Sequence, residues 1–255
     1  MVSHLRRVCG PGVGSGELEA LAAEALASYG RYWAESLRLP GVAAPAVLAD
    51  LEIRGLEVID AALGGGRGVL LALPHLGGWE WGGRYLVANG YATSVVVEAL
   101  EPPEVLDWFA GLRRRLGMEV IPVGSNALVS SVAALSSNRV LCLLSDRVVP
   151  GVAAVEVDFF GAPARLPVGP VVLALRTGAP LVPAAVYFQK GTPGHRAVVR
   201  RPLPLSRRGR FRDDVIAGTQ LLAREMEVLV RAAPTQWHVL QPIWPGDTAL
   251  GRGDC

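Results

Sequence analysis

The sequence contains few of the residues that build cross-linked domains or metal centres. Its 255 residues include three cysteines, Cys9, Cys142 and Cys255, which are far apart and form no Cys-x-x-Cys pair. Dispersed cysteines in odd number argue against a disulfide framework or a zinc site and favour a reducing compartment. Lysine is almost absent, because Lys190 is the only one among 25 basic residues. Arginine therefore dominates the cationic surface, and its guanidinium group suits phosphate and carboxylate partners.

Net charge and unbroken apolar runs are also limited. The formal net charge of +2 is too small to indicate a nucleic-acid partner. Mean hydropathy is high at +0.33, but the most apolar stretch, 168–188, is interrupted by Arg176 and three prolines, so we expect no membrane span. No apolar run follows Arg6 and Arg7, so we expect no signal peptide. We expect a cytoplasmic protein, either soluble or seated on a membrane surface.

Several widespread catalytic signatures are missing. The sequence has no Gly-x-Ser-x-Gly elbow, no P-loop and no His-Glu-x-x-His. Only four histidines are present: His4, His75, His195 and His238. This short list narrows the choice of a general base. We assign no function to His4 and His195, which lie in loop-like contexts, and a structural role to His238.

The pattern of apolar runs predicts an α/β fold with a mostly parallel central sheet flanked by helices. Apolar strands separated by helices are typical of a sheet covered on both faces. Strands are expected at 69–73, 93–97, 119–122, 140–144, 181–188 and near 197–200, and helices at 77–89, 104–116, 127–135, near 167–177 and at about 213–232. The stretch around 155–160 is expected to be irregular.

No linker divides the chain, so we expect a single domain over residues 1–255. Helical spacing of apolar residues from Leu18 to Leu37 predicts one amphipathic helix, and 56–63 predicts a second. These two helices form an expected N-terminal helical segment of about 16–63. The catalytic α/β core is then expected over about 64–245.

His75 is the candidate general base. It follows the predicted strand 69–73 and precedes Gly77 and Gly78, which open a helix. In open parallel sheets, ligands bind at the carboxyl ends of the strands. Glu80 lies in the first helical turn, where it could fold back onto the imidazole, fix its tautomer and stabilise the imidazolium. Spacing alone equally allows a buried histidine and a glutamate that only favours the helix dipole.

The segment His75-Leu-Gly-Gly-Trp-Glu80 resembles the His-x4-Asp/Glu signature of glycerolipid-type acyltransferases. It is more similar to the His-x-Gly-Asn-Trp-Glu form of the bacterial lipid A late acyltransferases and the related phosphatidylinositol mannoside acyltransferases. Five further segments follow in the family's order, so the resemblance covers about residues 25–245. They lie around Arg113, at Ser145-Asp146-Arg147, at 159–170, at 173–183 and at 234–238.

The resemblance implies an O-acyltransferase. It would move a long-chain fatty acyl group from acyl-CoA, or from acyl carrier protein, to a hydroxyl of a glycolipid, in the closest branch a phosphatidylinositol mannoside. Acyl-CoA would be a co-substrate, and no cofactor or metal is implied. A lipid A-like or lysophospholipid acceptor, or a non-catalytic lipid-binding relative, remains an alternative.

The resemblance also implies roles for individual residues. His75 would take the proton of the attacking hydroxyl, and Glu80 would hold the ring. Arg113 would bind a phosphate of the donor or acceptor, since guanidinium groups bind phosphate bidentately.

Three further residues complete the expected site. Asp146 and Arg147 would orient the acceptor sugar, or would form a structural ion pair with each other. Gly169 would shape a turn beside the thioester. The sequence also departs from the family pattern, because Gly78 stands where asparagine is common and Asp146-Arg147 stands where Asp-Gln is common.

An arginine-rich stretch, 195–212, contains seven arginines and no acidic residue. Beside an apolar groove it would seat the protein on an anionic lipid surface, at about 1 kcal/mol per well-placed arginine. This predicts a peripheral protein on the cytoplasmic face of the plasma membrane. Family members usually carry a longer apolar N-terminal helix, so we expect weaker attachment here. The alternative is a solvated loop balanced by Asp213 and Asp214.

Overall fold

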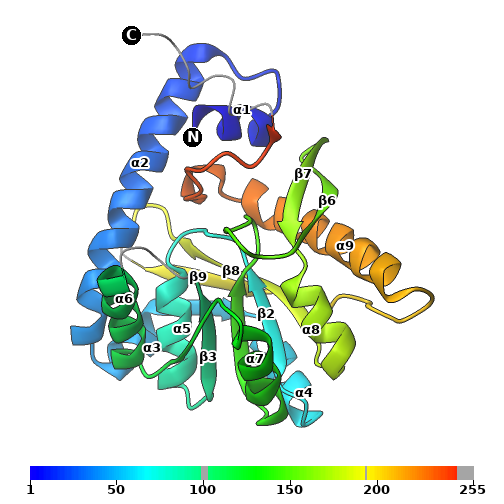
Figure 1. Cartoon of the computed structure of the whole chain (residues 1–255). Helices are drawn as coiled ribbons and strands as arrows, with labels where there is room; N and C mark the ends of the chain where they lie inside the picture. Colours follow the sequence, from blue (N-terminus) through cyan, green and yellow to red (C-terminus); the bar gives the residue numbers. More distant parts are fainter. Residues whose placement is uncertain (99–102, 193, 246–255) are drawn as a thin grey trace.

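The computed structural model of the chain describes residues 1–98, 103–192 and 194–245 (Figure 1). The helices are α1 (Val2–Cys9), α2 (Ser15–Arg38), η1 (Leu39–Gly41), α3 (Ala44–Asp50), α4 (Leu56–Gly64), α5 (Trp79–Ala88), α6 (Pro103–Arg115), α7 (Ala127–Ser136), α8 (Gly169–Thr177), α9 (Phe211–Arg231) and η2 (Pro234–Gln236). The strands are β1 (Leu51–Arg54), β2 (Val69–Leu73), β3 (Thr93–Val97), β4 (Glu119–Pro122), β5 (Val140–Leu144), β6 (Ala154–Phe159), β7 (Ala162–Pro167), β8 (Leu181–Phe188) and β9 (His195–Val199).

Seven strands form the central sheet in the order β1-β9-β8-β2-β5-β3-β4. Neighbouring strands are parallel except β8 and β9, which are antiparallel. The predicted α/β class and mostly parallel sheet are therefore confirmed. Every strand expected in the core is present, within two residues of its predicted bounds.

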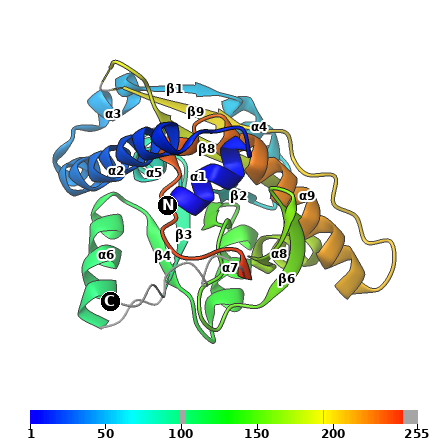
Figure 2. The same ribbon diagram turned by 90° about the horizontal axis from the view of Figure 1, so that it is seen from above.

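Alternation along β2 shows how the sheet divides the core into two layers. Leu70 and Ala72 pack with buried residues of α7, α8 and α9. Val69, Leu71 and Leu73 face the other way and pack against α4 and α5. Helices thus cover both faces of the strands, as Figure 2 shows from above. Among the described residues, no helix is long and apolar enough to cross a membrane.

Two parts of the fold differ from the predictions. The stretch expected to be irregular is the hairpin β6–β7, whose turn places Phe160 and Gly161 at positive φ, 52° and 73°. The sequence of β6 alternates apolar and acidic residues from Val155 to Phe159, which is the two-residue period of a half-buried strand. The segment expected to be helical over 16–63 also contains β1, which pairs with β9 at the sheet edge. A four-residue edge strand with mixed burial leaves a weak pattern.

Candidate active site

The register of two central strands brings two polar side chains together. β2 and β5 are parallel neighbours, and their last residues, Leu73 and Leu144, are paired. His75 and Asp146 each follow two residues later. They therefore emerge side by side at the carboxyl ends of the strands, where open parallel sheets bind ligands.

Two hydrogen bonds join His75 to Asp146. Nδ1 of His75 lies 2.6 Å from Oδ1 of Asp146, and the backbone N–H of His75 donates to Oδ2 at 2.7 Å. The indole N–H of Trp237 donates to the same Oδ2, also at 2.7 Å. Burial of Asp146 raises its pKa, but the charge of His75 and these three hydrogen bonds lower the pKa below its ordinary value. Asp146 is therefore an ionised acceptor.

This geometry leaves Nε2 of His75 as the reactive nitrogen. An ionised Asp146 keeps the proton of a neutral imidazole on Nδ1, so the lone pair lies on Nε2. No residue in the described part of the chain hydrogen-bonds to Nε2, and the side chain is 20% exposed. A hydroxyl placed here can transfer its proton to Nε2, and Asp146 stabilises the imidazolium that forms.

Trp237 is held by aromatic side chains from distant parts of the chain. Its ring contacts His4 of α1, and Phe159 and Phe160 of the β6–β7 hairpin. Trp244 packs beside it. Two of the segments that resemble the family, 159–170 and 234–238, therefore contact each other and fix the position of the indole N–H that donates to Asp146. Trp237 lies in the segment 234–238, which resembles the family, but nothing in the sequence indicates that its indole reaches the carboxylate of Asp146.

A cavity of about 480 Å³ adjoins His75. Ligand pockets commonly enclose roughly 300–1,000 Å³. One wall consists of the aromatic side chains Tyr29, Tyr32 and Trp33 of α2. Apolar side chains cover much of the remaining surface: Leu106, Phe109, Leu128, Leu143, Val149, Val152 and Leu173. An apolar cavity beside a histidine–carboxylate pair suits a substrate with an alkyl chain.

Comparison with known proteins identifies the family of the chain. A family model described as bacterial lipid A biosynthesis acyltransferase matches residues 7–245. The chain belongs to this family. A relative from Mycobacterium tuberculosis (strain H37Rv), named phosphatidylinositol mannoside acyltransferase, is 39% identical over 239 residues, which cover 92% of this chain and 73% of the relative. A relative of the same name from Mycolicibacterium smegmatis is 38% identical over 230 residues, covering 89% and 73%.

In this acyltransferase, Glu80 is bonded to Arg113 and not to His75, which corrects the predicted His75–Glu80 dyad. Oε1 of Glu80 accepts from Nη2 of Arg113 at 2.8 Å and from Nε at 3.1 Å. Successive helical residues point about 100° apart. Trp79, at the start of α5, faces the cavity, so Glu80 turns away into the interior.

The Glu80–Arg113 pair is buried. Oε2 of Glu80 has no hydrogen-bond partner within the described residues, and burial raises the pKa of Glu80 although Arg113 partly offsets the effect. Arg113 also lies over the ring of Trp79, with 4.9 Å between the guanidinium carbon and the ring centroid. Arg113 is part of the cavity lining, but its charge is already matched by Glu80.

The remaining predicted site residues also line or adjoin the cavity. Asp146 and Arg147 do not pair with each other, because Nη2 of Arg147 lies 2.5 Å from Oε2 of Glu98, which follows β3. Arg147 and Glu98 both line the cavity. Gly169 begins α8 at the cavity wall, and a Cβ built there meets no atom within 4 Å. Gly169 therefore leaves open space at the cavity wall, and its place beside the thioester stays a prediction.

The arginine-rich stretch 195–212 contributes no residue to the cavity lining. After β9 it runs along α9, away from α6 (Figure 1). Arg200 pairs with Glu225 of α9 at 2.5 Å, and Asp214 accepts the backbone N–H of Arg208. Three residues of the stretch, Ala197, Val198 and Val199, line a separate apolar pocket of about 50 Å³, and the seat on a lipid surface stays a prediction. Over the described ranges, no three His, Cys, Asp or Glu residues are grouped to hold a metal ion.

Proposed function

We propose that this acyltransferase moves a long-chain fatty acyl group from acyl-CoA, or from acyl carrier protein, to a hydroxyl of a phosphatidylinositol mannoside. The observation that carries the proposal is the hydrogen-bonded His75–Asp146 pair beside an apolar cavity. The names of the two relatives, both phosphatidylinositol mannoside acyltransferases, support the acceptor class.

The transfer needs a base, and His75 is placed to act as one. Nε2 takes the proton of the acceptor hydroxyl while the oxygen attacks the thioester carbonyl. The C–S bond then breaks, and the imidazolium returns its proton to the leaving thiolate. Asp146 remains ionised throughout and balances the charge of the ring. The acyl group passes directly to the acceptor, so the reaction needs no acyl-enzyme and no cofactor beyond the acyl donor.

Arg147 is the residue best placed to bind a phosphate of the donor or acceptor. It lines the cavity from the residue next to Asp146, and its partner Glu98 is itself partly exposed and can give way. A guanidinium group binds phosphate in a bidentate manner. We place the reaction at the cytoplasmic face of the plasma membrane, with the protein attached peripherally so that a thioester donor and a lipid acceptor both reach His75.

The test is acyl transfer from radiolabelled palmitoyl-CoA by the purified full-length protein. The acceptors are a phosphatidylinositol mannoside, a lipid A-like disaccharide and a lysophospholipid, each in detergent micelles. Radiolabel in the mannoside alone supports the proposal. Preferential labelling of another acceptor would assign that acceptor as the substrate. Transfer to none of the three would indicate that this protein binds lipid without catalysing acyl transfer.

A further inference from the structure

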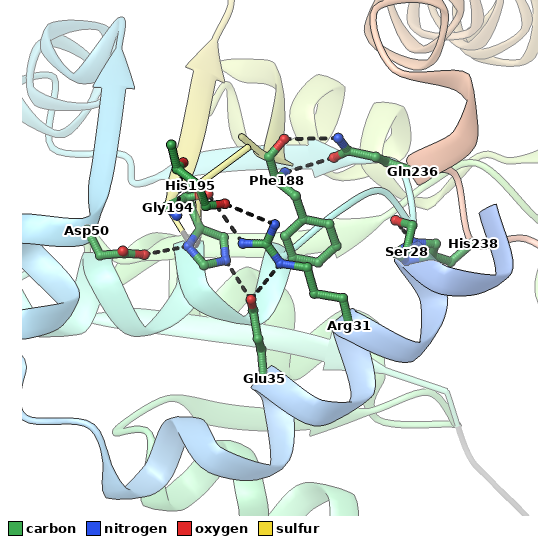
Figure 3. Close-up of polar contacts among 10 residues, drawn as sticks. Ser28, Arg31, Glu35, Asp50, Phe188, Gly194, His195, Gln236 and His238 are labelled. Atoms are coloured by element: carbon green, nitrogen blue, oxygen red, sulfur yellow. Dashed lines mark hydrogen bonds and ion pairs between the residues drawn. The ribbon is translucent and has the colours of Figure 1, made fainter. Parts of the chain in front are cut away.

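Helix α2 carries a polar row beside its aromatic cavity face. Glu24, Ser28, Arg31 and Glu35 recur at intervals of four, three and four residues, so they share one side of the helix. Each contacts a segment far away in sequence, and the partners are Thr235, His238, the carbonyls of Thr192 and Gly194, and His195. Figure 3 shows Ser28, Arg31 and Glu35 pointing from α2 toward His238, Gly194 and His195.

His195 is the buried centre of this contact. It is the first residue of β9 and is 1% exposed. Nδ1 lies 2.6 Å from Oδ2 of Asp50, the last residue of α3, and Nε2 lies 2.7 Å from Oε2 of Glu35. Ionised carboxylates only accept hydrogen bonds, so both ring nitrogens must carry a hydrogen. With both carboxylates ionised, the geometry fits an imidazolium that donates to each of them.

The charged groups that face this ring come from two helices. Glu35 and Arg31 belong to α2, and Asp50 belongs to α3. Arg31 also donates to Glu35 from Nε at 2.6 Å. Burial raises the pKa of Glu35, but the hydrogen bonds and charges of His195 and Arg31 lower it below its ordinary value. α5 and β8 present uncharged rings: Trp81 stacks on the imidazole at 4.4 Å between centroids, and Phe188 meets it edge-on at 5.6 Å.

The same imidazole is packed against the loop that follows His75. A Cβ built on Gly78 would lie 2.8 Å from Cδ2 and 2.9 Å from Nε2 of His195, closer than real side chains approach. Gly78 precedes Trp79, which lines the cavity. The ring of His195 therefore sits between α2, which forms the aromatic wall, and the loop that carries His75.

We propose that His195 is a positioning residue: as an imidazolium it holds α2 against the His75 loop and so maintains the aromatic wall of the cavity. Loss of its proton leaves one ring nitrogen as a lone pair facing a carboxylate, so attraction becomes repulsion at Glu35 or Asp50. The wall then loosens, and the cavity binds an alkyl chain more weakly as pH rises. This inference depends on the proposed function in one respect: it assumes that the cavity binds the alkyl chain of the substrate.

A single substitution separates this mechanism from ordinary packing. In Glu35→Gln, the amide oxygen can replace Oε1 as the acceptor for Arg31, and the amide N–H can donate to a neutral Nε2 of His195. The contact then no longer needs the imidazolium, because a neutral ring with its proton on Nδ1 satisfies both neighbours. His195→Gln is the comparison variant that removes the contact, because a glutamine side chain cannot donate hydrogen bonds to both Glu35 and Asp50.

The experiment measures binding of cis-parinaric acid to the full-length protein by fluorescence, from mildly acid to alkaline pH. In the wild-type protein we expect the Kd to rise roughly tenfold on the alkaline side, the scale of one charged hydrogen bond. Glu35→Gln should bind tightly across the range, and His195→Gln weakly across it. Amide hydrogen exchange of α2, corrected for intrinsic rates, should follow the same pattern.

Equal pH dependence in the wild-type protein and Glu35→Gln would overturn the proposal, as would pH-independent binding by the wild type. This comparison decides even if His195→Gln does not fold. The probe is not an acyl donor, so its binding does not depend on catalysis. If cis-parinaric acid binds with the expected pH dependence but the protein transfers no acyl group to any glycolipid, the proposed function is wrong and the role of His195 stands.

Discussion

Oδ1 of Asp146 lies 2.6 Å from Nδ1 of His75 because the two residues stand at equivalent positions beyond paired strand ends. They are 71 residues apart in the chain, and only the parallel register of β2 and β5 makes them neighbours. The His75–Asp146 pair is thus built by the sheet, and the indole N–H of Trp237, from the last described segment, donates to the same carboxylate.

Asp146→Asn should reduce turnover by roughly 10²- to 10⁴-fold while the protein remains folded. The amide N–H would donate to Nδ1 and move the imidazole proton to Nε2, which can then no longer accept a proton. Acyl transfer under saturating palmitoyl-CoA measures the effect, with thermal denaturation as the control. Turnover within a few-fold of wild type would assign the orienting role to another residue.

Trp237→Phe should cost about 1–3 kcal/mol of the free energy of unfolding, because it leaves a buried carboxylate oxygen short of one donor. It should also raise the pKa of Asp146. A carboxylate with a depressed folded-state pKa adds stability above its unfolded pKa and loses it as pH falls through the folded pKa. The acid limb of the stability profile should therefore shift to higher pH. Urea titrations at several acidic pH values measure both effects, and an unshifted limb would contradict the assigned contact.

Glu80→Gln should affect stability more than chemistry. Removing one charge of the buried Glu80–Arg113 pair should cost up to about 3–5 kcal/mol, because the arginine is left without its counter-charge. Turnover per folded molecule should stay near wild type. Chemical denaturation and acyl-transfer assays on the same preparation separate the two quantities.

The double variant Glu80→Gln/Arg113→Gln is the matched control, and it should recover part of the stability lost by Glu80→Gln alone. A Glu80→Gln protein of normal stability whose turnover is lower by roughly 10²-fold or more would restore the dyad expected from the His-x4-Glu motif.

His238 gives the acyltransferase a second pH dependence. Burial lowers the pKa of His238 to about 4, and the charge of His75 adds to the effect. The unfolded chain therefore binds a proton below about pH 6.5 that the folded chain does not, so stability falls as pH falls between about 6.5 and 4. From about pH 7 to about pH 5, the loss due to His238 should be about 2 kcal/mol. His238→Gln should show a drop in unfolding free energy that is smaller by this amount, and an identical drop in both proteins would disprove the assignment.

The sequence predicts the sheet and the position of His75 well, because continuous apolar strands and a histidine beyond a strand end are local patterns. The partner of His75 is not local. Glu80 is the nearest acidic residue along the chain, yet α5 directs it inward to Arg113. Asp146 belongs to a recognisable motif, but its bond to His75 depends on strand register.

The charged network around His195 is equally hidden in the sequence. His195 has the sequence context of a loop residue, and its two acidic partners lie 145 and 160 residues away. One local signal is present: Glu24, Ser28, Arg31 and Glu35 repeat at helical spacing beside the apolar row of α2. A polar row of this kind usually faces solvent, so only the folded arrangement reveals its partners.

The most direct test of the account is the turnover of His75→Ala, measured as acyl transfer per folded molecule with palmitoyl-CoA binding determined in parallel. If Nε2 of His75 takes the acceptor proton, turnover should fall by about 10²- to 10⁴-fold while the Kd for palmitoyl-CoA stays within about twofold. Near-normal turnover in a folded His75→Ala protein would contradict the mechanism.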